Sequence, residues 1–186
     1  MSVIKTDRWK DRNGNVYNNV LQVQHTLYAQ TFMSMNGGER EVIPGFFCDI
    51  TPRSRDSMIV CIGSLAVGWE TTPEWSWYID RTIGGADGHP FNSVPVGTSS
   101  RWSSSRMWGY HGGPRDGNSV NYTRELESFY NVVFDEPKTI EPVRYHVVLS
   151  DRWSNRDKYI NRSNEDSNNG YITRGTSSLT LLEIAQ

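Results

Sequence analysis

The chain has 186 residues, of which 36% are hydrophobic and 22% are charged, and 19 Lys and Arg against 21 Asp and Glu give a formal net charge of −2. This composition excludes a disordered tail, a nucleic-acid binder that depends on bulk positive charge, and a membrane helix of roughly 20 apolar residues. The length predicts one large domain, or one domain with an arm. The first eight residues contain no apolar signal-peptide core, so we expect synthesis in a cytoplasm.

Residues 1–19 are polar, charged and rich in turn formers, and they contain too few apolar positions to fold alone. One interpretation is a frayed terminus, and the other is a docking arm that a partner orders. Large amphipathic and apolar side chains would anchor such an arm, because they contribute much of the energy of an interface. The predicted anchors are Trp9, Val16 and Tyr17. The sequence therefore predicts an N-terminal docking arm over 1–19 and a folded domain over 20–186.

From Val20 onwards the hydrophobic pattern has a period of two, which is typical of β-strands. In the first expected strand, three residues share one face: Leu21, Val23 and Leu27. The expected strand before Thr51-Pro52 alternates in the same way, with one face made of Phe46, Cys48 and Ile50. Cys48, like Cys61 further along, lies in an apolar segment and is interpreted as a buried free thiol, with a disulfide left open.

The segment 58–69 is apolar on both faces. Such a strand is either buried on both faces, or buried on one and used at an interface on the other. A helix is disfavoured because several residues are β-branched and because Gly63 and Gly68 interrupt the run.

Four more regular segments are expected: Trp75 to Asp80, Leu126 to Phe134, Val143 to Leu149 and Ser177 to Ala185, with a short strand at Tyr159 to Arg162. Residues 84–121 are rich in Gly, Pro and Ser and predict long loops, with one strand near 101–110. Strands at this spacing, without amphipathic helices, predict an all-β fold, an antiparallel β-sandwich that is jelly-roll-like.

The sequence contains no recognisable catalytic set. His25 and His146 lie in the middle of expected strands, on the phase taken as polar, and are interpreted as structural. The spacing of the remaining His and Asp candidates fits no metal motif: Asp87, His89, His111 and Asp116. Nothing marks the paired carboxylates as buried: Glu70 with Glu74, and Glu125 with Glu127. We therefore predict a protein that is not an enzyme and has no cofactor and no metal.

Glycosylation sequons start at Asn121 and Asn161 and are interpreted as chance matches. Six tryptophans lie within or beside expected loops: Trp69, Trp75, Trp77, Trp102, Trp108 and Trp153. Three roles stay open for them: closing the core, contacting another subunit, and stacking on sugar rings. The sugar-stacking candidates are Trp102, Trp108 and Tyr110, with hydroxyl-bonding partners among Asp87, Asn92 and Asp116.

Several motifs together resemble small virion structural proteins of tailed bacteriophages, especially marine and cyanobacterial ones. The motifs are Ile4-Lys-Thr-Asp, Asp11-Arg-Asn-Gly-Asn, Val20-Leu-Gln-Val-Gln, Ile50-Thr-Pro-Arg-Ser-Arg-Asp-Ser-Met-Ile-Val, Ile79-Asp-Arg-Thr-Ile-Gly, Phe134-Asp-Glu-Pro with Tyr145, Tyr159-Ile-Asn-Arg-Ser, and the closing segment 177–186. Their order and spacing extend the resemblance over most of the chain.

The resemblance implies a β-sandwich subunit of a phage particle, either a tail-fibre tip or a capsid decoration, and a homotrimer. The expected partners are further copies of the chain, other capsid or tail proteins, and a host surface glycan. We expect neither nucleic-acid binding nor membrane insertion. The alternative function is a glycan-binding module for host adhesion, in which loops 84–121 present the aromatic residues. A polysaccharide hydrolase would require a buried acidic pair.

Overall fold

A computed structural model describes residues 20–34, 41–69, 75–84, 94–96, 111–112, 126–151, 157–170 and 172–186. Every regular element in these ranges is a β-strand, which confirms the predicted all-β class. The strands are β1 (Val20–Tyr28), β2 (Phe32–Ser34), β3 (Glu41–Ile50), β4 (Met58–Trp69), β5 (Trp75–Ile83), β6 (Val94–Pro95), β7 (His111–Gly112), β8 (Glu127–Asp135), β9 (Val143–Asp151), β10 (Lys158–Ile160) and β11 (Ser177–Ile184).

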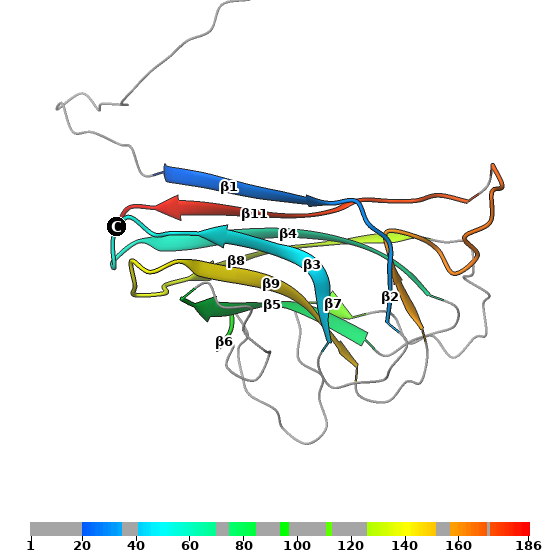
Figure 1. The fold of residues 1–186 in the computed structure, drawn as a ribbon, viewed down its shortest axis with the longest axis horizontal. Helices are drawn as coiled ribbons and strands as arrows, with labels where there is room; N and C mark the ends of the chain where they lie inside the picture. The colour runs from blue at the N-terminus through cyan, green and yellow to red at the C-terminus, as the bar shows by residue number, and fades with distance from the viewer. Residues whose placement is uncertain are drawn as a thin grey trace, which may run out of the picture.

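The strands form two antiparallel sheets (Figure 1). Sheet I has the order β1-β11-β4-β8. The short strand β10 pairs with the end of β4 that β11 does not reach, and β2 pairs with β10. Sheet II has the order β3-β9-β5-β6, and β7 also pairs with β5. If the short strands β2, β7 and β10 are set aside, sheet I joins the first, eighth, third and sixth strands and sheet II joins the second, seventh, fourth and fifth. This alternation is the strand order of a jelly roll, as the spacing of the segments predicts.

The core lies between the inner faces of the two sheets. Its largest fully buried side chains include Trp75, Trp77, Tyr145 and Phe46. A Cβ atom at Gly63 would lie 2.8 Å from the Trp77 ring, so this glycine makes room for the indole. The two tryptophans thus have the core role that was one of the three open interpretations.

Cys48 of β3 and Cys61 of β4 belong to the same core, and both are free thiols, as predicted. Burial raises the pKa of Cys48 and raises that of Cys61 well above its ordinary value. Both groups therefore stay protonated and serve as small apolar side chains.

Asn161 joins β1, β4 and β11 just after β10 ends. Its Nδ2 donates hydrogen bonds to the carbonyl oxygens of Tyr28 (2.7 Å) and Gln30 (2.9 Å), and its Oδ1 accepts one from the Ser177 hydroxyl (2.6 Å). The backbone N–H of Asn161 also donates to the Ala66 carbonyl. Because the side chain is fully buried and both ends of the amide are bonded, the sequon at Asn161 cannot accept a glycan.

Glu183 of β11 is buried at one end of the sandwich, where it holds the turn between β3 and β4. Its carboxylate accepts hydrogen bonds from Gln22 Nε2 (2.7 Å) and from the Arg53 N–H (2.6 Å). Burial alone would raise the pKa of this carboxyl, but the hydrogen-bond donors of Ser57, Gln22, Arg53 and Ser54 outweigh burial and the pKa is lowered.

The lowered pKa predicts how stability depends on pH. A carboxyl whose folded pKa lies below its unfolded value stabilises the fold above the unfolded pKa, and this contribution is lost as pH falls through the folded pKa. We expect Glu183→Gln to lower the free energy of unfolding by about 2 kcal/mol at pH 7. The difference from the natural chain should shrink as the pH falls from 5 to 3.

Urea titrations followed by tryptophan fluorescence measure this difference in the free energy of unfolding. A difference that is constant with pH would contradict the role of Glu183. Glu127→Gln, the same substitution at an exposed residue of β8, is the control.

Candidate interaction surface

Strand β8 presents large apolar side chains to solvent. Phe129 and Val133 point into the core, whereas Tyr130, Val132 and Phe134 alternate with them on the outer face of sheet I. Their exposed fractions are 70%, 51% and 60%. This strand was predicted over Leu126 to Phe134, and the side chains that it buries are Phe129 and Val133, next to the exposed ones.

Strand β1, at the opposite edge of sheet I, also turns large apolar side chains towards solvent. Val23 and Leu27 share a face, as predicted, but that face is the outer one, and they are 53% and 61% exposed. The inner side of the strand carries Gln22, whose amide donates to the Glu183 carboxylate and to the Thr51 carbonyl (2.6 Å). The polar side of β1 is thus turned towards the protein and its apolar side towards solvent.

The strands between these two edges complete a continuous surface. The outward residues of β11 and β4 lie in register with those of β1 and β8, so that side chains form rows across four strands. We call this surface the outer apolar face and define it by Val23, His25, Leu27, Ser178, Thr180, Leu182, Val60, Ile62, Ser64, Tyr130, Val132 and Phe134. None of these residues is Asp, Glu, Lys or Arg.

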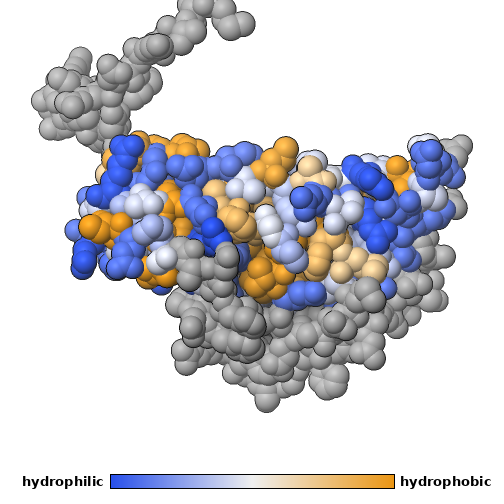
Figure 2. All heavy atoms as spheres, in the orientation of Figure 1, coloured by the Kyte–Doolittle hydropathy of each residue, from blue (hydrophilic) through white to orange (hydrophobic). Residues whose placement is uncertain are grey.

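Exposed hydrophobic residues gather on sheet I. Among the described residues nine large hydrophobic side chains are exposed, and seven of them lie on β1, β4 or β8: Val20, Val23, Leu27, Ile62, Tyr130, Val132 and Phe134. Part of this set is visible as orange along the upper edge of the molecule, where β1 lies (Figure 2). Scattered hydrophobic residues are normal on a protein surface, but a contiguous group marks an interaction site.

The size of the face follows from strand geometry. Four strands about 4.8 Å apart and three rows of side chains about 6.7 Å apart, with their van der Waals margins, cover on the order of 500 Å². At one end of the face, Leu126 and Ala66 both lie against Gly175, and Ala66 is only 2% exposed. The open part therefore begins at the row of Ser64 and Tyr130 and extends away from β10.

His25 is the histidine of this face. The sequence placed it on the polar phase of β1, and this prediction is wrong, because His25 lies in phase with Val23 and Leu27. Its Nδ1 lies 2.8 Å from the Thr180 hydroxyl of the neighbouring strand. This contact joins the ring to β11.

The outer face of sheet II has a different character. Tyr78, Asp80, His146 and Val148 point away from the core on β5 and β9 and are nevertheless buried. His146 therefore has a structural position, as predicted. The two sheets differ in that only sheet I carries an exposed apolar outer surface among the residues that the structure describes.

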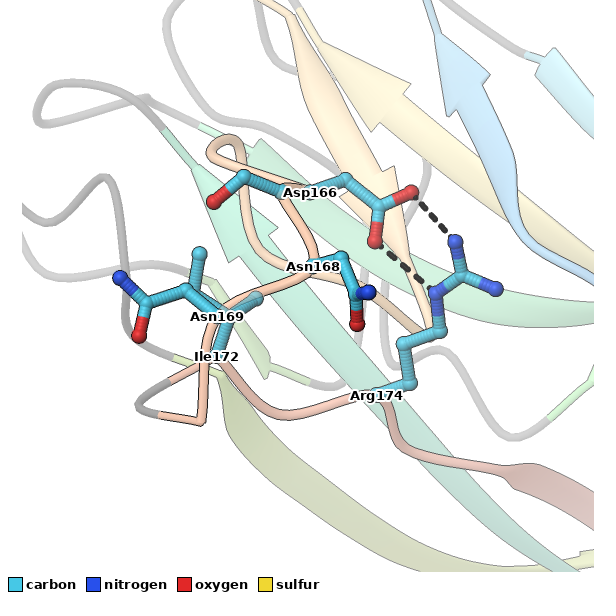
Figure 3. Close-up of a pocket in the computed structure, with 6 residues that line it drawn as sticks. Asp166, Asn168, Asn169, Ile172 and Arg174 are labelled. Carbon is cyan, nitrogen blue, oxygen red and sulfur yellow. Dashed lines mark hydrogen bonds and ion pairs between the residues drawn. The ribbon is translucent and has the colours of Figure 1, made fainter.

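A polar cleft of about 460 Å³ lies in the turn between β10 and β11 (Figure 3). It is lined by Asp166, Ser167, Asn168, Asn169, Ile172 and Arg174. Arg174 Nε and Nη2 each donate to the Asp166 carboxylate at 2.9 Å, and these hydrogen bonds lower the pKa of Asp166. Because the carboxylate is already paired, the cleft contains a surface ion pair and not a general acid or base.

The predicted site residues lie outside the described ranges. This applies to the anchors Trp9, Val16 and Tyr17 and to the sugar-stacking candidates Trp102, Trp108 and Tyr110, so both roles stay predictions. Within the described ranges, no group of three His, Cys, Asp or Glu side chains could hold a metal ion. Those ranges also contain no helix with the length and hydropathy needed to cross a membrane.

Sequence reasoning missed the outer apolar face as a unit, although its signal was present. Residues 129–134 are apolar in both phases of the strand, as residues 58–69 are, and this pattern was interpreted as a possible interface only for the latter. The dual pattern on two adjacent strands could have indicated an interface wider than one strand.

Comparisons with known proteins give the chain no family. No family model matches, and no curated protein matches. Among solved structures, a chain of the infectious bursal disease virus Gx strain is 11% identical over 100% of this chain and 41% of its own length, with a TM-score of 0.34. A chain of the Gt strain is 12% identical over 100% and 43%, also with a TM-score of 0.34. The chain thus spans less than half the length of these two chains, and the assignment of the jelly roll depends on the strand order given above.

Proposed function

We propose that this chain is a non-enzymatic structural subunit of a bacteriophage virion, of the tail-fibre or capsid-decoration type. Residues 1–19 would dock onto the capsid or tail, and the sandwich would be displayed outward. Synthesis would take place in the cytoplasm of the host. Host adhesion through a surface glycan would be a function of the displayed domain.

The observation that carries this proposal is the outer apolar face. A chain that works as a free monomer rarely exposes an uncharged apolar surface spanning four strands, since such a surface promotes association. A subunit of an assembly can expose it in the single chain, because the neighbouring subunit covers it. The polar side chains of the described residues also support a structural role for the chain. Asn161, Glu183 and Asp166 all form hydrogen bonds that hold the fold together.

Two further points support a viral assembly. The sequence motifs resemble phage virion proteins over most of the chain. The jelly roll is an architecture that viral capsid domains and lectins use, which is support by analogy of fold.

The docking role of residues 1–19 is testable by deletion. We expect a chain that starts at Val20 to keep its folded domain, measured by circular dichroism and thermal unfolding, and to be lost from purified particles. A full-length chain with Trp9, Val16 and Tyr17 all replaced by Ala should show the same loss, because these side chains are the expected anchors. Incorporation of either variant at the natural level would contradict the proposed arm.

Gold-labelled antibody against residues 20–186 would locate the subunit by electron microscopy of intact particles. Label on the capsid would identify a decoration subunit, and label at the tail or its fibres would identify a fibre subunit. Intact particles without any label would overturn the virion proposal itself.

A further inference from the structure

We propose that the outer apolar face of one chain packs against the outer apolar face of a second copy of the same chain. This inference concerns the free protein in solution and goes beyond the proposed place in a virion. It follows from the chemistry, the size and the strand polarity of the face.

The lack of charged side chains on the face restricts which partner surface can cover it. A partner surface with Asp, Glu, Lys or Arg would bring charges against a surface that offers them no counter-charge, and burial of an unpaired charge is strongly unfavourable. The matching surface must itself be uncharged and apolar. The same face on another copy contains no Asp, Glu, Lys or Arg and is apolar or aromatic at eight of its twelve positions, with Ile62 and Val132 in its middle row.

The size of the face also fits self-association. Two faces of about 500 Å² bury on the order of 1,000 Å² in total, which is the lower bound for a specific interface. Sheets that pack face to face lie about 10 Å apart, a gap that large side chains fill. Tyr130 and Phe134 at one edge and Leu27 at the other have the required length.

The distribution of polar and apolar side chains on β1 agrees with packing against a second copy. Its inner side carries Gln22, bonded to the Glu183 carboxylate, and of the residues of this strand Tyr28 at its end belongs to the core, whereas Val23 and Leu27 do not. Val23 and Leu27 reach an apolar environment only when another surface covers them. A second copy supplies such a surface to β1 and to β8 at once.

Residues 1–19 of the same chain are a weaker candidate for the occupant. This segment contains Lys5, Asp7, Arg8, Lys10, Asp11 and Arg12 among few apolar residues. It would therefore place charges over an apolar surface that is four strands wide. The second copy is favoured because its covering surface is uncharged throughout.

The test compares the oligomeric state of the full-length chain and of two matched variants by sedimentation equilibrium between 5 and 200 µM. Val132→Lys places a charge in the middle row of the face, on its edge strand β8. Ile140→Lys places the same charge at a residue that is equally exposed, 53% against 51%, but lies in the turn after β8 and is not one of the twelve residues of the face. Thermal unfolding of both variants checks that each single chain still folds.

We expect the natural chain and Ile140→Lys to sediment as multiples of 21.3 kDa, and Val132→Lys to dissociate to the monomer with at least about tenfold weaker association. A monomeric natural chain at 200 µM would overturn the inference, as would equal association of the two variants. A monomer in which Val132→Lys alone lowers the melting temperature would show that the chain covers its own face, and would also overturn it. Because these measurements use purified protein, they are independent of the particle-labelling result.

Discussion

Replacement of Asn161 by Asp is expected to lower the free energy of unfolding by at least about 3 kcal/mol. The amide nitrogen of Asn161 donates to two carbonyl oxygens, those of Tyr28 and Gln30, and the side chain is fully buried. An aspartate of the same shape has no N–H donor and would direct a carboxylate oxygen at both carbonyls. The variant therefore loses two hydrogen bonds and buries a charge without a partner.

The backbone of Asn161 adds a second requirement. Its φ of 61° lies in the left-handed region, which Asn and Gly adopt more readily than other residues. Asn161→Gly keeps this conformation and removes only the side-chain bonds, whereas Asn161→Ala removes the bonds and strains the backbone. We expect Asn161→Ala to be less stable than Asn161→Gly, by about 1 kcal/mol.

Urea unfolding at pH 7, followed by tryptophan fluorescence, measures these differences. Asn168→Asp is the matched control, because the same substitution is made at an exposed residue of the turn between β10 and β11. Its effect should stay within about 0.5 kcal/mol. Equal effects of Asn161→Asp and Asn168→Asp would show that Asn161 does not hold the strands together.

The sandwich could be predicted from the sequence where one face of a strand is apolar and the other polar. Phe46, Cys48 and Ile50 of β3 alternate with polar or exposed positions, and all three lie in the core as expected. Trp75 and Trp77 of β5 follow the same rule. In such strands the period of two determines which side chains are buried, because a shift by one residue would expose the whole apolar set.

The rule fails in strands that are apolar in both phases or that lie at a sheet edge. In β8 both phases are apolar, so the pattern alone does not decide whether Val132 or Val133 enters the core. In β1 the apolar phase is turned outward, because the inner phase supplies Gln22 to the buried Glu183. Both outcomes depend on residues more than 45 positions away in the chain, which local patterns do not contain.

The long-range polar contacts could not be predicted from the sequence either. Asn161 has the sequence context of a sequon, and Glu183 is an ordinary strand residue until the turn between β3 and β4 folds over it. The Tyr28 carbonyl that Asn161 binds and the Arg53 N–H that Glu183 binds are each separated from them by more than 100 residues. Only the jelly-roll order, which brings the first, third and last strands into one sheet, creates these contacts.

A polar cluster between the two sheets is expected to couple strongly in a double-mutant cycle. Arg81 of β5 donates from Nη1 to both oxygens of Asp135 of β8, at 2.7 and 2.8 Å. The Tyr145 hydroxyl of β9 donates to the same carboxylate at 2.8 Å. Burial, and then the charge of Asp135, raise the pKa of Tyr145, so the phenol keeps its proton and acts as a donor.

We expect Asp135→Leu alone to destabilise the fold by about 3 to 5 kcal/mol, because Arg81 keeps a charge at a side chain that is only 14% exposed. Arg81→Met with Asp135→Leu should recover much of this loss, because the pair is then replaced by apolar groups of similar volume. Tyr145→Phe should have a smaller effect, about 1 to 2 kcal/mol, since it removes one hydrogen bond.

The ion pair of Arg144 and Asp49 is the matched control for this cycle. It also has two contacts at 2.7 and 2.8 Å, donated by Nε and Nη2 and not by a single nitrogen, but Asp49 is 49% exposed and both residues belong to sheet II. Its coupling energy should therefore stay below about 1 kcal/mol. If the Arg81–Asp135 coupling were equally small, the two sheets would be joined by the apolar core alone. A large coupling would instead show that a buried ion pair fixes β8 against sheet II. Since β8 carries Tyr130, Val132 and Phe134 on its outer side, this contact would also set the position of the outer apolar face.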